Sequence, residues 1–308
     1  MDKKDQPLVS VIMNCYNGEK YLREAIDSVY AQTYENWEII FWDNASTDKS
    51  AEIAKAYNDK LKYYYGEKYI SLGAARNKAL EQCNGDYIAF LDVDDLWVSK
   101  KLEKQIPLFD DNKIGIVITN ALYFSSNRKR KILYRLKKPP TGKVFKRLLE
   151  NYYIAMPTVV IRKKSLTLLN HWFDPEFNLI EDLDLFTRIS YKWELGYVDS
   201  ILAKYRLHDK SFTFIQRANF SIEIKAFLNK YHKIIPEFNQ RYKKQIYCLN
   251  RVIDWFVAQE LVANGSFTEA KAKMKKYSFD SIKWFTKYSL ISMPYIRKIF
   301  ITRLLHRT

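Results

Sequence analysis

Three carboxylates within four positions could bind a metal cation: Asp92, Asp94 and Asp95 directly follow the apolar run 87–91. If the chain stays extended, Asp92 and Asp94 point to one side and Asp95 to the other. Two carboxylates about 5–6 Å apart repel each other by roughly 3 kcal/mol at an effective dielectric near 20. A divalent cation removes that repulsion, and hard oxygen ligands suit Mg²⁺ or Mn²⁺, which also bind phosphate oxygens. The alternative is that Asp94 or Asp95 only caps the next helix.

Polar clusters also follow three other predicted strands. They comprise residues 14–18, residues 43–48, and residues 73–77, which open a helix. Arg76 in the first turn of that helix could pair with a phosphate group. Each cluster alone has a structural explanation, as a turn, a cap or a solvated charge. Because all of them fall at one edge of the predicted sheet, together they favour a binding site.

A further acid pair, Glu181 and Asp182, precedes apolar residues with helical spacing. Acids at a helix N-terminus complement the helix dipole, which is one explanation of the pair. The other is a general base, which takes the proton of a hydroxyl group as that group attacks.

The elements that must position these residues alternate along the first hundred residues. Strands are predicted at 8–13, 37–42, 61–65 and 87–91, and helices at 21–31, 46–56 and 74–82. This alternation predicts βαβ units, a parallel sheet and therefore an α/β fold. Ligands bind such sheets at the carboxyl ends of the strands, where the polar clusters lie.

The pattern is looser after residue 97. We predict a helix over 98–109, a strand over 114–119, and strands 123–126 and 132–136 paired around the basic turn 127–130. Beyond about residue 209 the chain is predicted to be helical to its end, with a break at 265–266.

Charge is distributed unevenly over the 308 residues, whose formal net charge is +16. Residues 201–308 carry 21 Lys and Arg against 7 Asp and Glu, and residues 265–308 carry 10 against 2. A basic amphipathic stretch with aromatic residues is typical of binding to an anionic membrane surface. The alternative is a helical subdomain whose aromatic residues pack on the front domain. The apolar residues concerned are Phe267, Trp284, Phe285, Tyr288, Ile291, Tyr295, Ile299, Phe300 and Leu304.

Other classes of protein lack their sequence signals here. Three separated cysteines give no disulfide framework, and neither a signal peptide nor a membrane-spanning run is visible, so we expect a cytoplasmic location. No GxG, Walker A lysine loop or GxSxG motif occurs. Nucleic-acid binding through the basic C-terminal region is the alternative function. We favour no nucleic-acid partner, because a sheet edge with many carboxylates repels phosphate unless a metal intervenes.

The motifs taken together resemble those of glycosyltransferase family 2, which has the GT-A fold. They are residues 8–17, 37–48, 73–77 and 90–95, in the order and approximate spacing of that family. The resemblance covers about residues 7–210. It implies a GT-A type nucleotide-sugar-binding domain with a mainly parallel central sheet flanked by helices, and an inverting transfer from a nucleoside-diphosphate sugar.

The resemblance also implies roles for individual residues on the donor side. Tyr16 and Asn17 belong to the donor site, with Tyr16 stacking near the base. Asp43 accepts the hydrogen of the base N3, which favours a UDP-sugar or dTDP-sugar, and Arg76 stabilises the donor phosphates. Asn14, Asn44 and Ala45 depart from the family pattern, which often has Pro, Asp and Gly there. Asp92 contacts the ribose or the metal.

Metal and acceptor roles follow from the same resemblance. Asp94 is the firmer ligand of Mn²⁺ or Mg²⁺, and His208 is a further candidate ligand. Asp182, beside Glu181, is the general base that deprotonates the acceptor. The acceptor is expected to be a glycan or a lipid-linked saccharide in bacterial surface-polysaccharide synthesis, at the inner face of the cell membrane. The predicted division is a catalytic domain over 1–210, with a nucleotide-binding part to about 97 and an acceptor part over 98–210, and a basic helical region over 211–308.

Overall fold

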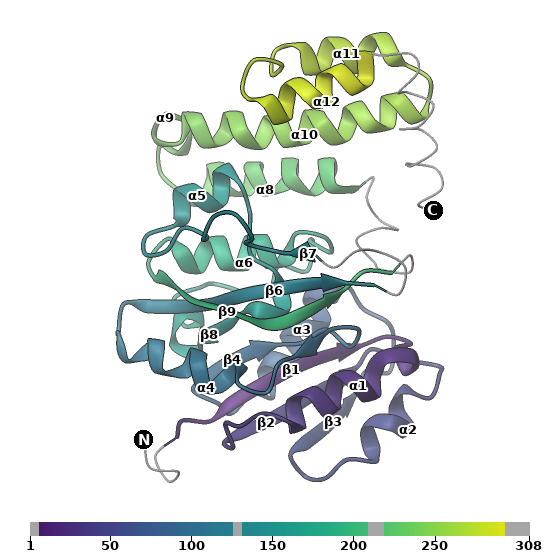
Figure 1. Ribbon diagram of the computed structural model, residues 1–308, viewed down its shortest axis with the longest axis vertical. Coiled ribbons are helices and arrows are strands. Elements are labelled where there is room, and N and C mark those ends of the chain that lie inside the picture. The colour runs from purple at the N-terminus through teal and green to yellow at the C-terminus, as the bar shows by residue number, and fades with distance from the viewer. Residues whose placement is uncertain (1–5, 126–130, 209–218, 293–308) are drawn as a thin grey trace. The chain divides into compact units, whose positions relative to one another are not determined.

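The computed structural model describes residues 6–125, 131–208 and 219–292 (Figure 1). The chain forms two compact units. The first contains residues 1–148 and 152–207, and the second contains residues 149–151 and 208–308.

The first unit begins with the parallel sheet that the sequence predicts. Strands β1 (Val9–Cys15), β2 (Trp37–Asp43), β3 (Leu61–Tyr65) and β4 (Tyr87–Phe90) lie in the order β3-β2-β1-β4, and each pair is parallel. The helices between them are α1 (Glu19–Tyr30), α2 (Ser50–Lys55) and α3 (Leu72–Glu81). Because these strands are all parallel, their carboxyl ends lie at one edge of the sheet.

Alternation along the strands buries both faces of this sheet. Val9, Val11 and Met13 of β1 pack in one cluster with the apolar residues of α1, whereas Ile12 packs in a second cluster with Leu80 of α3. The period of two residues along a strand produces this division. The second cluster also contains residues of α6 (Glu181–Ser190), so α3 and α6 contribute to the same core.

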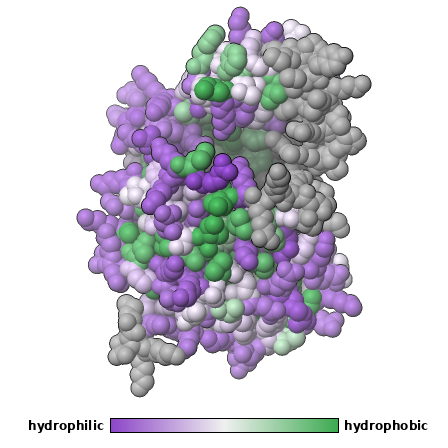
Figure 2. Space-filling view, in the orientation of Figure 1, coloured by the Kyte–Doolittle hydropathy of each residue, from purple (hydrophilic) through white to green (hydrophobic). Residues whose placement is uncertain are grey.

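The other half of the sheet is mixed. Its order continues from β4 through β8 (Val160–Arg162), β6 (Ile114–Phe124) and β9 (Glu194–Arg206) to β5 (Leu96–Trp97). Strand β8 is antiparallel to both of its neighbours, and β6 is parallel to β9. Hydrophilic residues cover much of the visible face of the first unit, and hydrophobic residues gather over β6 and β9 (Figure 2).

Two predicted elements in this half differ from the structure. The predicted helix over 98–109 is α4 (Lys101–Gln105) followed by a 3-10 turn, η2 (Ile106–Asp110), because Pro107 has no N–H to continue the α-helix. The predicted pairing of 123–126 with 132–136 is present in shorter form, between β6 and β7 (Lys131–Ile132). The turn 127–130 lies outside the described residues.

The remaining short elements of the chain from residue 145 to 166 connect these strands. They are α5 (Phe145–Glu150), η3 (Met156–Thr158) and η4 (Lys163–Leu166).

The second unit is helical, as predicted. Its helices are α8 (Phe220–Ile234), α9 (Phe238–Arg241), α10 (Lys243–Ala263), α11 (Phe267–Lys275) and α12 (Ile282–Ser292). The predicted break is present: α10 ends before Gly265, whose φ of +82° is one that glycine adopts readily. Among the described residues, none of the helices combines the length and the apolar content that crossing a membrane requires.

Candidate functional site

The three carboxylates after β4 lie in a tight turn. The backbone N–H of Asp95 donates to the carbonyl of Asp92 at 3.0 Å, so the extended conformation assumed for residues 92–95 is wrong. Asp95 is buried, and one of its oxygens accepts the backbone N–H of Arg206 at 2.7 Å. Asp92 and Asp94 stay partly exposed. The turn therefore separates one structural carboxylate from two that a ligand can reach.

Two elements distant in sequence hold this turn. Arg206, at the end of β9, donates from Nε to the carbonyl of Asp94 at 2.8 Å and from Nη2 to Glu24 of α1 at 2.9 Å. On the other side, a Cβ added to Gly18 would lie 2.9 Å from Cγ2 of Val93. The absence of a side chain at Gly18 thus allows the loop after β1 to pack against the turn.

The electrostatics of the two accessible carboxylates fit a divalent cation. Partial burial raises the pKa of the Asp92 carboxyl, the Arg76 guanidinium opposes that rise, and the negative charge of Asp94 adds to it. A cation near both groups offsets this repulsion. The donors are carboxylate oxygens, which are the ligands that Mg²⁺ and Mn²⁺ prefer.

Arg76 joins this turn to the acid pair of α6. It is 3% exposed, its Nη2 lies 2.9 Å from Oδ1 of Asp92, and its Nη1 forms an ion pair with Oε1 of Glu181. The ring of Phe173 lies beneath the guanidinium, with its centroid 5.5 Å from Cζ. The guanidinium is thus held by two carboxylates, and its predicted contact with the donor phosphates stays a prediction.

The acid pair lies in the first turn of α6, as the helical spacing predicted. Asp182 accepts the N–H of Leu183 at 2.6 Å and the hydroxyl of Tyr152 at 2.9 Å. Burial raises the pKa of the Glu181 carboxyl to about 8 and also raises the pKa of Asp182, while the charge of Arg76 lowers both. Carboxyl groups with raised pKa values are suited to accept a proton near neutral pH.

The predicted base-side residues lie at the carboxyl ends of β1 and β2. Tyr16 is 53% exposed, and its ring meets that of Tyr69 edge-on with centroids 4.7 Å apart. Asp43 is fully buried and accepts hydrogen bonds from the N–H of Ser46 at 2.8 Å and the hydroxyl of Tyr63 at 2.7 Å. Tyr16 can therefore be reached directly, whereas the side chain of Asp43 is covered by the protein.

Asn17 links the two loops that carry these residues. Its side-chain oxygen accepts the N–H of Thr47 at 2.8 Å, and its own N–H donates to the hydroxyl of Ser46 at 3.0 Å. Asn17 has a φ of +52°, a conformation that asparagine tolerates better than most residues. The structure gives Asn17 a loop-linking role, and its contact with a donor stays a prediction.

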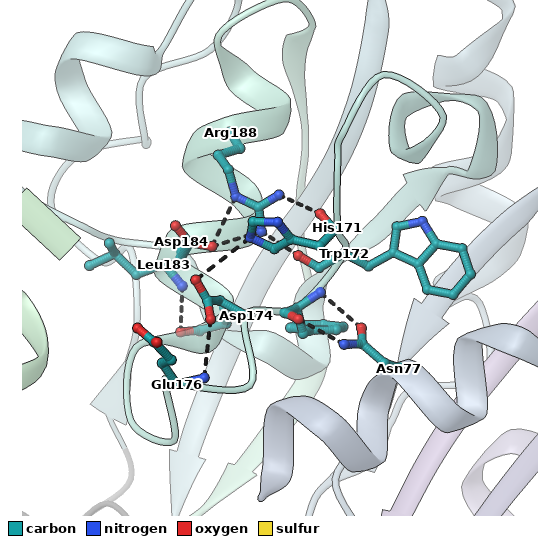
Figure 3. A network of polar contacts seen from close by, with 10 residues as sticks. Asn77, His171, Trp172, Asp174, Glu176, Leu183, Asp184 and Arg188 are labelled. Atoms are coloured by element: carbon teal, nitrogen blue, oxygen red, sulfur yellow. Dashed lines mark hydrogen bonds and ion pairs between the residues drawn. The ribbon is translucent and has the colours of Figure 1, made fainter. Parts of the chain in front are cut away.

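A polar network holds the segment 171–177 between α3 and α6 (Figure 3). Arg188 of α6 contacts Asp184 through Nε at 2.9 Å and Nη2 at 2.7 Å, and it donates to the carbonyls of His171 and Trp172. Asn77 of α3 exchanges two hydrogen bonds with the backbone of Phe173, at 2.7 and 2.9 Å. Because the ring of Phe173 supports Arg76, this network positions the guanidinium that joins Asp92 to Glu181.

The side chains of His171, Asp174 and Asp184 in this network also have the spacing of a cation site. One ligand atom from each lies within 4.8 Å of the others. The guanidinium of Arg188 already places a positive charge against Asp184, because its Nε and Nη2 both donate to Oδ2 of Asp184. We therefore assign the cluster a structural role.

Replacing Arg188 by Met is expected to destabilise the protein by about 3–5 kcal/mol, because it leaves the fully buried Asp184 without its cationic partner. The free energy of unfolding from urea titration measures this loss. Lys78→Met is the control, since Lys78 and Glu81 form an exposed pair and exposed pairs contribute about 0–1 kcal/mol. Equal effects of the two substitutions would show that the Arg188–Asp184 ion pair does not stabilise the protein more than an exposed pair does.

His208 begins the second unit, and nothing in the structure tests it as a ligand. Sequence reasoning missed the roles of Tyr152 and Tyr63, and it noted Arg206 beside His208 without predicting its contact with the turn. Tyr152 is 30 residues from Asp182, and no motif connects the two positions.

Comparison with known proteins identifies the family of the chain. Residues 10–168 match the family described as Glycosyl transferase family 2. Over 210 residues the chain is 34% identical to UDP-Glc:alpha-D-GlcNAc-diphosphoundecaprenol beta-1,3-glucosyltransferase WfgD of Escherichia coli, covering 67% of this chain and 80% of that protein. The chain spans less than two thirds of the length of several Rickettsia glycosyltransferases that it matches, between 31% and 66%.

Solved structures share the fold. The chain is similar to the mannosyltransferase PcManGT from Pyrobaculum calidifontis in complex with GDP-Man and Mn²⁺, with a TM-score of 0.64, 16% identity, and 99% of this chain and 87% of that chain covered. It is also similar to S. aureus TarS 1-349 in complex with UDP-GlcNAc, with a TM-score of 0.57, 19% identity, and 94% and 92% covered. These likenesses confirm the predicted GT-A type fold with its helical extension.

Proposed function

The chain belongs to glycosyl transferase family 2, and from that premise we propose that it transfers one sugar from a UDP-sugar or dTDP-sugar to a hydroxyl group of a glycan or lipid-linked acceptor. One observation carries the proposal: Arg76 forms ion pairs with Asp92 of the turn after β4 and with Glu181 of the acid pair. The predicted donor and acceptor sides thus belong to one buried cluster. A relative whose name specifies UDP-Glc and a structural neighbour that binds UDP-GlcNAc support UDP as the nucleotide.

In the proposed reaction, the acceptor oxygen attacks C1 of the sugar while Asp182 takes the proton of that hydroxyl group. The new bond joins the acceptor oxygen to C1, and the bond from C1 to the diphosphate oxygen breaks with its electron pair. The attack comes from the side opposite the leaving group, so the configuration at C1 inverts. No covalent intermediate with the enzyme forms, and one base suffices.

Asp94 and Asp92 are the residues that we propose to hold Mn²⁺ or Mg²⁺, with His208 as a further candidate. When bound, such a cation offsets negative charge on the leaving nucleoside diphosphate. Arg206 keeps the turn of Asp94 in place through its hydrogen bond to the Asp94 carbonyl. A structural neighbour that contains Mn²⁺ supports a divalent cation in this fold.

Tyr152 is expected to tune the base. Its hydroxyl stabilises the charged form of Asp182, so Tyr152→Phe should raise the pKa of Asp182. Because Asp182 must be ionised to act, the acid limb of the profile of kcat/KM against pH should move upward by about one pH unit. The matched control is Tyr153→Phe, whose hydroxyl donates instead to the carbonyl of Pro140. An acid limb that stays in place in Tyr152→Phe would show that Tyr152 only supports the fold.

The proposed setting is the inner face of a bacterial cell membrane, where the enzyme adds single sugars to surface glycans from the cytoplasmic side. The acceptor named for the Escherichia coli relative is a diphosphoundecaprenol-linked sugar, which supports a lipid-linked acceptor. The basic second unit supports contact with an anionic membrane surface through residues 265–308.

Screening a panel of nucleoside-diphosphate sugars tests the transfer directly. The assay measures nucleoside diphosphate released in the presence of Mn²⁺, with and without a lipid-diphosphate sugar acceptor. We expect one or two donors to be turned over, with uridine or thymidine as the nucleoside. Failure of every donor would overturn the proposed activity.

A further inference from the structure

Most described aromatic residues of the basic tail, by which we mean residues 265–308, pack in the core of the second unit. Trp284 and Ile291 of α12 are 6% and 1% exposed, and they pack in one cluster with Trp255 of α10 and Met274 of α11. Phe267 and Tyr288 are packed against the same cluster. Tyr295, Ile299, Phe300 and Leu304 lie outside the described residues. Among the tail residues that were singled out from the sequence and that the structure describes, Phe285 alone is exposed, at 53%.

Two further apolar side chains are more exposed than Phe285. Phe279 is 94% exposed and Ile282 is 86% exposed. Phe279 lies in the turn that connects α11 to α12, and Ile282 is the first residue of α12. Residues three apart on a helix share a face, so Ile282 and Phe285 lie on the same side of α12. Hydrophobic residues reach the surface of the second unit where α11 meets α12 (Figures 1 and 2).

Polar contacts fix the backbone of this apolar tip, which we define as Phe279, Ile282 and Phe285. Asp280, between Phe279 and Ile282, forms an ion pair with Arg251 of α10 at 2.5 Å and accepts the hydroxyl of Tyr247 at 3.0 Å. Asp280 is the single acid between residues 275 and 287 of the sequence. Its charge is therefore neutralised by α10.

Lysines flank the apolar tip. Lys275 at the end of α11 and Lys283 in the first turn of α12 are exposed. Lys276 is also exposed, although its Nζ lies 3.0 Å from Asp254. Apolar side chains beside lysines match the interface of an anionic bilayer, in which the acyl boundary accepts the former and the headgroups attract the latter. A second copy of this chain would bring like charges together at the same surface.

We propose that Phe279, Ile282 and Phe285 insert into the headgroup boundary of an anionic phospholipid bilayer, with Lys275, Lys276 and Lys283 contacting the headgroups. This inference deepens the proposed function, because it identifies the residues that bring the enzyme to a membrane-borne acceptor. It differs from the first of the two sequence-based interpretations, in which Trp284 and Ile291 contribute to a membrane-binding surface. Those two residues are core residues instead.

The test uses the full-length chain and sedimentation with vesicles of phosphatidylglycerol and phosphatidylethanolamine. The triple variant Phe279→Ser, Ile282→Ser, Phe285→Ser should lower the vesicle partition coefficient at least ten-fold. The matched control is Ile222→Ser, which removes a side chain that is 63% exposed on α8 of the same unit, and it should bind vesicles as the natural chain does. Vesicles of pure phosphatidylcholine should bind the natural chain at least ten-fold more weakly.

Calorimetric titration with UDP and Mn²⁺ accompanies each variant. The triple variant should bind UDP as the natural chain does, because its substitutions lie in the second unit and are exposed. Loss of vesicle binding with retained UDP binding supports the inference. The inference is overturned if the triple variant binds anionic vesicles as strongly as the natural chain. It is also overturned if the natural chain does not bind anionic vesicles. Absence of UDP binding in the natural chain contradicts the proposed function separately.

Light scattering without vesicles tests whether a second copy of this chain, instead of a bilayer, covers the apolar tip. If the natural chain is oligomeric and the triple variant is monomeric, the apolar tip joins copies of this chain and the membrane inference is wrong. The same molar mass for both proteins agrees with insertion into a bilayer.

Discussion

Asp94→Asn is expected to lower the rate of sugar transfer by at least about 1000-fold and to abolish the Mn²⁺-dependent part of UDP binding. The substitution keeps the shape of the side chain but removes the charge that we propose holds the cation. A bound cation contributes several kcal/mol to the stabilisation of charge on a leaving diphosphate, and about 1.4 kcal/mol corresponds to a factor of ten in rate. Initial rates and UDP calorimetry with and without Mn²⁺ measure the two effects.

Asp59→Asn is the control for this experiment, because Asp59 is an exposed acid of the same unit before β3. It should leave both measurements unchanged. If Asp94→Asn retains Mn²⁺-dependent UDP binding at the natural strength, Asp94 is not a ligand. Asp95 is not available as a ligand in place of Asp94, because it is buried and accepts the backbone N–H of Arg206.

Asp182→Asn should have the second large effect, with a different signature. We expect transfer to fall by about 100- to 10,000-fold, the range attributed to general bases, because an amide cannot take the acceptor proton. UDP binding with Mn²⁺ should stay within two-fold of the natural chain, since Asp182 accepts hydrogen bonds from Tyr152 and Leu183. Single-turnover transfer and UDP calorimetry separate these quantities.

Glu176→Gln serves as the control for that substitution, because Glu176 is an exposed acid shortly before α6. Near-full transfer by Asp182→Asn would remove Asp182 from the role of base. Weakened UDP binding instead would show that its charge supports the donor side through Arg76. The two substitutions, Asp94→Asn and Asp182→Asn, therefore divide the site into its donor and acceptor functions.

The parallel half of the fold could be predicted because its signals are local. Each strand is a short apolar run that ends at a polar cluster, and each is followed by a helical pattern. The mixed half could not be predicted in the same way. Strands β8 and β5 have three and two residues, and the pairing with β4, β6 and β9 that defines them comes from distant segments.

The carboxylates of the candidate site could be located at the ends of elements from the sequence, but the contacts that hold them could not be predicted. Asp92, Asp94 and Asp182 were visible as charges at the ends of elements. The hydrogen bonds of Arg206 to the turn and of Tyr152 to Asp182 join residues far apart in sequence, and no periodic pattern encodes them. The interpretation of residues 92–95 as extended failed because a turn closes between Asp92 and Asp95.

Ala45 departs from the sequence pattern of the resembling family, and the structure shows the backbone conformation at this position. Its φ of +65° is left-handed, a conformation that favours glycine, and the resembling family often has glycine there. Alanine therefore stands here in a backbone conformation that suits glycine better, in the loop beside Asp43.

The central claim is that one cluster binds a nucleoside diphosphate through a divalent cation. A calorimetric titration of the full-length chain with UDP, with Mn²⁺ present and again with a chelator, tests it most directly. The account predicts binding with Mn²⁺, loss of binding with the chelator, and recovery when Mn²⁺ is restored. UDP binding of equal strength with and without Mn²⁺ would contradict this claim. Absence of UDP binding together with tight, salt-sensitive binding of RNA would also contradict it.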